Sequence, residues 1–204
     1  VVIEGNLTIT DSATNSSSIT VSNQTNIPTG TLTNKEGASV FLNGDTTIHT
    51  IENSGDANLS GNTNTITYFS NSGTFTPAEN STLNIVSEIS NNDAGLFNAE
   101  NITVNITGPA GSIIGNGPER TRFGTLSVNN SLTLSFSNDI YVKTLSLFGA
   151  GEDGKLTITS TNPSKIYISE SQGTGQFLTL DSSSIPSIVD ENGIEAGYLY
   201  SVEE

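Results

Sequence analysis

The chain has 204 residues, enough for one domain or two small ones, and it lacks Cys, Met and Trp. Without cysteine it cannot form a disulfide scaffold, a zinc finger or a thiol nucleophile. The 24 Asn, 28 Ser and 28 Thr outnumber the hydrophobic residues, which make up 33% of the chain. The net charge of −15 disfavours nucleic acid and anionic lipid as partners. Only 13% of residues are charged and apolar residues recur in short bursts, so we expect a folded chain with a lean core.

The first residues, Val1-Val2-Ile3, show no initiator Met, basic n-region or apolar h-region. The longest apolar runs are far below the roughly 18 residues of a membrane span. We therefore expect residues 1–204 to be a single-domain fragment of a longer chain, least regular after about residue 182. The lack of cysteine, with so much Asn, Ser and Thr, suits an exported bacterial protein.

Short strands with alternating apolar and polar residues are predicted along the chain, separated by turns rich in Asn, Gly, Ser and Asp. No segment shows a sustained helical period, and Asp93 to Glu100 is the one place where a short helical turn is expected. The clearest strand patterns are Leu7–Thr10, Ile19–Val21, Thr82–Val86, Ile102–Ile106, Leu132–Phe136, Leu145–Leu147, Leu156–Ile158 and Ile166–Ile168.

A short internal repeat is the most informative feature. Gly37, Gly55 and Gly73 recur at a constant spacing of about 18 residues, and the text Asn-Ser-Gly ends at each of the last two. The same offset of 18 residues relates three apolar pairs, which are Ile48 and Ile66, Ile51 and Phe69, and Phe41 and Leu59. It also relates Asn53 to Asn71, whereas Asn34 precedes Asn53 by one residue more.

A repeat of this length predicts a parallel β-solenoid with coils of about 18–20 residues. Coils would stack about 4.8 Å apart, so that equivalent residues form ladders. We expect Ile48 over Ile66 and Ile51 over Phe69 inside, and the three glycines at one corner with positive φ. Stacked asparagine amides would hydrogen-bond between coils.

Two segments are predicted to protrude between coils. One is Gly108 to Arg122, rich in Gly and Pro, and the other is Ser169 to Gly175. The first contains Glu119, Arg120 and Arg122, the densest charged group with a positive balance. Because loops on rigid scaffolds often carry binding residues, these three are the candidate partner-binding site. The alternative is an exposed charged group that keeps the loop soluble.

Three features of the sequence resemble catalytic or ligand-binding patterns, and each lacks a residue or element that its chemistry needs. Residues 149–154 match G-x-G-x-x-G, but the strand-like Lys155–Thr159 follows where a dinucleotide site needs a helix. His49, the one histidine, lies inside the repeat without a G-x-S-x-G elbow. Acidic residues are not at calcium-ligand spacing. We therefore predict no catalytic residue, no metal and no cofactor.

The coil text at Ile51–Gly55 and Phe69–Gly73, with the Thr-Ile-Thr style of strand, resembles the passenger regions of bacterial autotransporter adhesins. Residues 123–134 and 139–147 are similar in style to rickettsial-type surface antigens. The resemblance implies a right-handed parallel β-helix at the outer surface, carried by a C-terminal membrane barrel outside this sequence. It implies partners such as a host-cell protein or glycan, or further copies of the chain. The period weakens after about residue 90, and the Gly-Gly-Ala-Ile repeats of chlamydial relatives are absent.

The sequence thus predicts an exported surface protein that acts as an adhesin or a rigid stalk, and not as an enzyme. Two alternatives remain open. A β-helical polysaccharide-active enzyme would gather carboxylates in one lateral groove. Tandem β-sandwich adhesin modules would replace the coils with hairpins, although Asn-Gly and Asp-Gly turns are few. The threonines at 46, 47, 63 and 65 are too irregular for the flat threonine face expected of an ice-binding protein.

Overall fold

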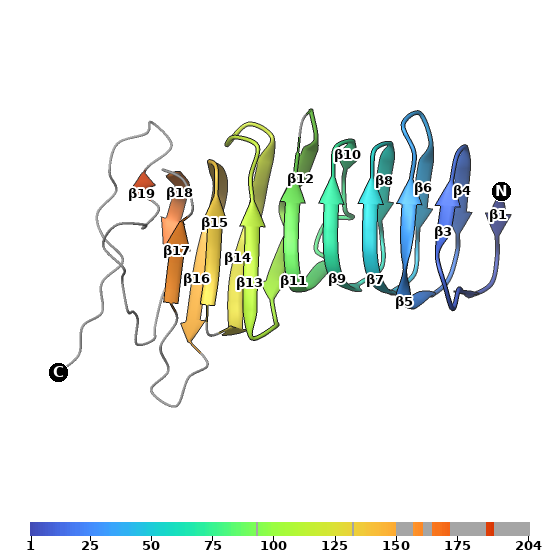
Figure 1. The fold of residues 1–204 in the computed structure, drawn as a ribbon, viewed down its shortest axis with the longest axis horizontal. Helices are drawn as coiled ribbons and strands as arrows, with labels where there is room; N and C mark the ends of the chain where they lie inside the picture. The colour runs from blue at the N-terminus through green and yellow to red at the C-terminus, as the bar shows by residue number, and fades with distance from the viewer. Residues whose placement is uncertain (93, 132, 150–156, 161–164, 172–186, 190–204) are drawn as a thin grey trace.

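The fold is an all-β solenoid of about seven turns (Figure 1). The computed structural model describes residues 1–92, 94–131, 133–149, 157–160, 165–171 and 187–189. Within these ranges there is no helix, and every strand pairing is parallel. The predicted β-solenoid is therefore confirmed. The sandwich alternative is excluded for this part of the chain, because it requires antiparallel hairpins.

Successive turns build three faces, each a column of parallel strands along the solenoid axis. The first face contains β1 (Val2–Ile3), β4 (Ser18–Val21), β6 (Ser39–Leu42), β8 (Asp56–Leu59), β10 (Thr74–Phe75), β19 (Ser187–Val189) and the first parts of β12 (Leu96–Ile106), β14 (Thr121–Ser131), β16 (Ile140–Gly149) and β18 (Lys165–Ser171). The second face contains β2 (Leu7–Thr8), the first halves of β5 (Thr25–Asn34), β7 (Thr46–Asn53), β9 (Thr63–Asn71) and β11 (Thr82–Asn91), the second halves of β12, β14 and β16, and the end of β18. The third face contains β3 (Ala13–Asn15), the second halves of β5, β7, β9 and β11, then β13 (Ala110–Ile114), β15 (Thr133–Ser137) and β17 (Thr157–Ser160).

Apolar ladders fill the interior, because alternate residues of each strand point inward and equivalent positions stack from coil to coil. The predicted pairs Ile48 over Ile66 and Ile51 over Phe69 are confirmed by the strand register. Each of these side chains is at most 2% exposed. The second-face ladder is Ile27, Ile48, Ile66, Ile85, Ile106 and Val128, and the third-face ladder is Leu32, Ile51, Phe69, Ile89, Ile113 and Phe136.

Four phenylalanines pack ring against ring in the middle of the core. Phe97 lies with its ring centroid 4.9 Å from Phe75, 5.3 Å from Phe123 and 5.6 Å from Phe69. All four side chains are at most 1% exposed. Such pairs add about 0.5–1.5 kcal/mol each to the burial term, so this cluster stabilises the change from the regular coils to the longer ones.

The predicted pairing of Phe41 with Leu59 is wrong by one position. Phe41 pairs with Asn58, and Leu42 pairs with Leu59. Phe41 points outward and is 40% exposed, whereas Leu42 is 1% exposed. The coil is one position shorter here than the repeat predicts, so the offset read from the glycines does not hold along the first face.

The glycine corner is only partly as predicted. Gly55 and Gly73 stack, since an added Cβ on Gly73 would lie 2.1 Å from the carbonyl oxygen of Gly55. Gly37 is not their equivalent: it is in a turn with φ of 73°, and its neighbour Ala38 lies beneath Gly55. Positive φ therefore occurs at Gly37 and not at Gly55 or Gly73. At the last two, glycine is required by close approach of one backbone to the next.

A buried asparagine ladder runs along the corner between the third and first faces. The predicted residues Asn34, Asn53 and Asn71 stack, with Nδ2 of each donating to Oδ1 of the next at 2.7 Å. The ladder is longer than predicted. It begins at Asn15, which donates to Asn34 at 2.8 Å, and continues from Asn71 to Asn91 at 2.8 Å. Each of the five asparagines is the last residue of its strand.

On the third face, the separation between equivalent residues of successive coils increases after Ile89. Along the asparagine ladder, the sequence separations from Asn34 to Asn91 are 19, 18 and 20. The apolar ladder of the third face keeps the same separations as far as Ile89. Its next two steps, to Ile113 and then to Phe136, are each longer by several positions. The predicted coil length therefore describes the third face only up to Ile89.

Three predicted irregular segments are corrected by the strands. The segment Gly108–Arg122 is not one loop, because β13 occupies its centre and β14 begins at Thr121. Asp93–Glu100 has no helical turn among its described residues, since β12 begins at Leu96. Ser169–Ser171 continues β18, and the rest of the second predicted loop lies outside the described residues. In the first two segments, the buried side chains of Ile113, Phe97 and Ala99 continue the apolar ladders.

Substituting Gly73 by Ala should destabilise the fold by about 1–3 kcal/mol, because the new Cβ meets a backbone carbonyl that cannot move without opening the coil. Gly5→Ala is the control, since a Cβ there has nothing within 4 Å, and it should change stability by less than about 0.5 kcal/mol. Urea unfolding followed by circular dichroism measures both. Equal stability of the two variants would contradict the close-approach argument.

Replacing Asn53 by Ala should cost about 2–4 kcal/mol. The change removes bonds to the Gly55 and Thr74 carbonyls, each 3.0 Å, and interrupts the ladder to Asn71. The matched variant Asn26→Ala changes an exposed asparagine on β5 and should be near neutral. Thermal denaturation of both variants would reveal the difference, and a small effect at Asn53 would mean that the ladder is dispensable.

Candidate functional site

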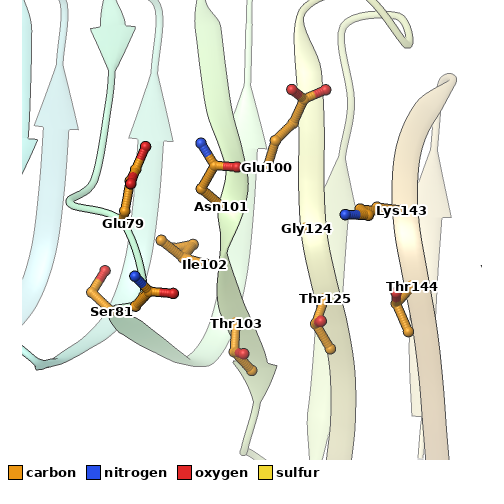
Figure 2. Close-up of a pocket in the computed structure, with 11 residues that line it drawn as sticks. Glu79, Ser81, Glu100, Asn101, Ile102, Thr103, Gly124, Thr125, Lys143 and Thr144 are labelled. Atoms are coloured by element: carbon orange, nitrogen blue, oxygen red, sulfur yellow. The ribbon is translucent and has the colours of Figure 1, made fainter.

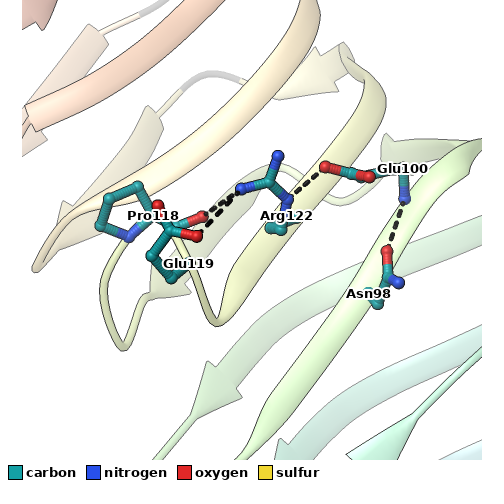
Figure 3. Close-up of polar contacts among 5 residues, drawn as sticks. All are labelled: Asn98, Glu100, Pro118, Glu119 and Arg122. Atoms are coloured by element: carbon teal, nitrogen blue, oxygen red, sulfur yellow. Dashed lines mark hydrogen bonds and ion pairs between the residues drawn. The ribbon is translucent and has the colours of Figure 1, made fainter. Parts of the chain in front are cut away.

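The three residues predicted to bind a partner lie around a short turn between β13 and β14 (Figure 3). Glu119 and Arg120 are in the turn and exposed, and Arg122 is the second residue of β14. The turn is fixed from beneath by a threonine: Asn91 Nδ2 donates to Thr121 Oγ1 at 2.9 Å. The residues therefore lie close together on a rigid corner.

Arg122 is held by contacts within the chain. Its guanidinium forms an ion pair with Glu100 of β12 and donates from Nη1 to the Pro118 carbonyl at 3.1 Å. A second carboxylate, Glu119, lies 3.8 Å from Nη1, and the guanidinium carbon lies 4.2 Å from the ring centre of Tyr141. Arg122 therefore connects β12, β14 and β16, and its side chain is 26% exposed.

Arg120 and Glu119 differ in how tightly they are held. Arg120 donates from Nη1 to the Ala94 carbonyl at 2.7 Å, and its own carbonyl accepts from the Phe97 amide at 2.7 Å. Glu119 is 91% exposed, and its contact with Arg122 is long. The structure thus gives the two arginines a role in joining coils, and Glu119 and Arg120 are the members of the predicted site that are exposed to solvent.

A groove with a volume of about 530 Å³ lies beside this cluster, at the corner between the first and second faces (Figure 2). Side chains from four successive coils enter it, so that it runs along the axis and not around it. Its lining residues are Glu79, Asn80, Ser81, Glu100, Asn101, Ile102, Thr103, Gly124, Thr125, Lys143 and Thr144.

The groove arises because neighbouring coils differ in length at this corner. Between Ala99 and Thr103 the chain has three residues, Glu100 to Ile102, whereas the next coil has only Gly124. A Cβ on Gly124 would lie 2.3 Å from the Glu100 carbonyl, so a larger residue cannot fill the step. In the preceding coil, Asn80 lies in a loop with a φ of 61°. Its backbone amide donates to the Asn101 carbonyl at 3.0 Å. The groove forms where the three-residue corner of one coil lies beside the one-residue corner of the next.

A second hollow, of about 460 Å³, lies on the second face nearer the N-terminus. It is formed by β2, β5, β7 and β9, the strands that precede those of the first hollow in the same column. The two hollows therefore follow one another along one side of the rod. The lining residues are Asn6, Leu7, Thr8, Gln24, Thr25, Asn26, Asp45, Thr46, Thr47, Thr63 and Thr65.

Outward residues of the second face form two regular rows. The register places five threonines, Thr63, Thr82, Thr103, Thr125 and Thr144, one above another. Two positions further along each strand, the row is Thr65, Asn84, Asn105, Ser127 and Ser146, and Asn105 Nδ2 donates to Asn84 Oδ1 at 3.0 Å. Sequence reasoning missed the threonine row because the intervals between its members are unequal and follow no constant period. The signal that identifies it is the Thr that opens each second-face strand from β9 onward.

The groove offers hydroxyls, amides and a few charges. Glu79 and Lys143 are exposed, and Glu100 is half-buried and paired with Arg122. In the described part of the chain, no three His, Asp or Glu residues gather where they could hold a metal ion. His49 lies on β7, its ring centroid 5.4 Å from that of Tyr68, and the G-x-G-x-x-G segment falls almost wholly outside the described residues. The arrangement is suited to binding a polar ligand.

Comparison with known proteins gave no relative for this chain. No family model matches it, and neither the curated proteins nor the solved structures contain a match. Over the described residues, no helix has the length and apolar character needed to cross a membrane.

Arg122→Ala should destabilise the fold by about 1–2 kcal/mol, because it removes an ion pair, a hydrogen bond to Pro118 and the contact with the Tyr141 ring. Arg122→Lys should recover only part of this loss, since an ammonium cannot make the same planar contacts. Glu119→Gln, at an exposed carboxylate, is the control and should change little. If all three variants unfold alike in urea, Arg122 has no structural role.

Proposed function

We propose that this chain is a non-catalytic binding rod of an exported bacterial surface protein, of the autotransporter-passenger type, that attaches to host cells through its second face. The observation that carries the proposal is the pair of hollows that follow one another along that face. The two hollows give the rod an extended, recessed polar surface. A protein that acted only as a spacer would not need such hollows.

The solenoid supports this role because its stability is local. Each coil pairs its backbone with the coils on both sides, so the rod is a stack of nearest-neighbour interfaces. Such a stack can hold binding residues at fixed distances over many coils without a large globular core. The resemblance of the Asn-Ser-Gly coil text to autotransporter adhesins agrees with a surface location.

Charge supports a neutral or basic partner. The net charge of −15 keeps the rod soluble and opposes anionic surfaces at short range. Within the groove, Glu79 and Glu100 stand against a single lysine, Lys143. We therefore place the partner among neutral glycans or neutral-to-basic protein surfaces of the host cell, with self-association of the rod as a further mode of attachment.

A glycan-active enzyme is the competing function, because Glu79 and Glu100 do enter one lateral groove. Glycosidases use such a carboxylate pair as acid and base or nucleophile. Glu100, however, forms an ion pair with Arg122, so its carboxylate is already engaged within the chain. This contact makes binding without turnover the better-supported function.

Beads coated with the purified chain should attach to host epithelial cells in a saturable way, and soluble chain should compete for the same sites. Beads coated with serum albumin are the control. Release of reducing sugar from polysaccharide, abolished by Glu79→Gln, would instead establish the enzyme. Beads that bind no more than the control, and soluble chain that shows no self-association, would overturn the proposal.

A further inference from the structure

We infer that the second face binds a linear, uncharged polysaccharide, extended along the solenoid axis with one sugar residue per coil. The inference rests on the proposed binding function and names the class of its ligand.

The backbone of the second face is occupied by the fold. Thr82, for example, pairs with Thr63 on one side and Thr103 on the other, and the same holds for Thr125 between Thr103 and Thr144. A peptide that binds by adding a strand needs unpaired backbone groups at a sheet edge, which the middle of this face does not offer. Recognition must therefore use side chains.

Those side chains are hydroxyls and amides in two rows. The threonine row, Thr63 to Thr144, supplies groups that both donate and accept, and the neighbouring row adds Asn84 and Asn105. A ligand that satisfies both rows must itself carry donors and acceptors at short intervals on both of its edges. Polyhydroxylated chains have this property, and hydrocarbon or aromatic ligands do not.

The interval between groups is set by coil stacking. Equivalent side chains on adjacent coils lie about 4.8 Å apart along the axis. This spacing is close to the rise of one pyranose in an extended β-linked polysaccharide, so each sugar would meet one threonine and, at Asn84 and Asn105, also a side-chain amide of the second row. The two hollows, along which the face is recessed, would accommodate the thickness of the chain.

The charge and polarity of the hollows restrict the class of polysaccharide further. The carboxylates of Asp45, Glu79 and Glu100 line the hollows and would repel uronic acids, sulfated sugars and phosphodiesters. Ile102 lines the first hollow but is only 4% exposed, so it offers little apolar contact. Among the described residues that line the hollows, none is aromatic. Hydrogen bonds repeated over several coils would therefore carry the affinity, and it should increase with ligand length.

The test uses the whole purified chain and β-1,4-linked oligomers of glucose and of N-acetylglucosamine, from two to six sugars, in isothermal titration calorimetry. We expect the dissociation constant to fall at least about tenfold from the trimer to the hexamer, since each added sugar contributes about one net hydrogen bond. Oligogalacturonate of the same lengths is the anionic comparator and should bind more weakly.

Location is tested with two matched double variants. Thr103→Val with Thr125→Val removes two stacked hydroxyls from the groove and keeps the β-branched shape, and should weaken hexamer binding about tenfold. Thr31→Val with Thr50→Val makes the same change at stacked, half-buried threonines of the third face and should leave binding unchanged. Urea unfolding of both variants confirms that they fold.

The outcomes separate this inference from the proposed function. Attachment of coated beads to cells without binding of neutral oligomers would overturn the inference and leave the adhesive function standing. Equal loss in the two double variants would place the ligand elsewhere. Inhibition of ice recrystallisation without oligosaccharide binding would assign the hydroxyl rows to ice. Failure of bead attachment together with binding of the oligomers would overturn the cell-adhesion proposal and keep the ligand class.

Discussion

Each coil of this protein lies about 4.8 Å from the next, and that short distance decides which side chains every position can carry. In the core, this spacing favours the stacking of identical side chains on adjacent coils, as for Ile48 with Ile66 and Phe75 with Phe97. At the corner of Gly55 and Gly73 it leaves no room for a Cβ. At the same corner it is the distance over which the side-chain amide of one asparagine reaches that of the next. Packing, turn chemistry and polar bonding thus follow from one spacing.

The asparagine ladder shows how a polar group can be buried in such a stack at no net loss. Asn53, at 2% exposure, accepts from one neighbour, donates to the next and also bonds to the carbonyls of its turn. A single buried asparagine without these partners would cost about 1–3 kcal/mol. The ladder therefore stabilises only as a continuous series, and it ends on Thr121, where a hydroxyl replaces the amide.

The repeat made the fold and part of the core predictable from the sequence, whereas the candidate site depends on register. Where coils have nearly constant length, a fixed offset gives the true pairing, as for Ile48 with Ile66, but where a coil is one position shorter the same offset misplaces Phe41. Longer coils still stack, because parallel pairing requires only alternating residues and tolerates insertions at corners. The groove forms between such unequal coils, so no common spacing relates its residues. The cluster of charged residues in the sequence was enough to single out the segment that contains Arg122. Its ion pair with Glu100 depends on how the coils stack, and only the structure shows it.

The ladder also bears on how such a rod can change in evolution. The coils that end at Asn34, Asn53 and Asn71 present the same groups to the coil above and to the coil below. Loss or duplication of one such segment in the gene would join surfaces that already match, so the rod can become shorter or longer by whole steps while its fold persists. Beyond Thr121 the coil length differs between faces, since Arg122 pairs with Tyr141 at a separation of 19 residues and Thr133 pairs with Thr157 at a separation of 24. There, variation is expected in the corners and not in the number of coils.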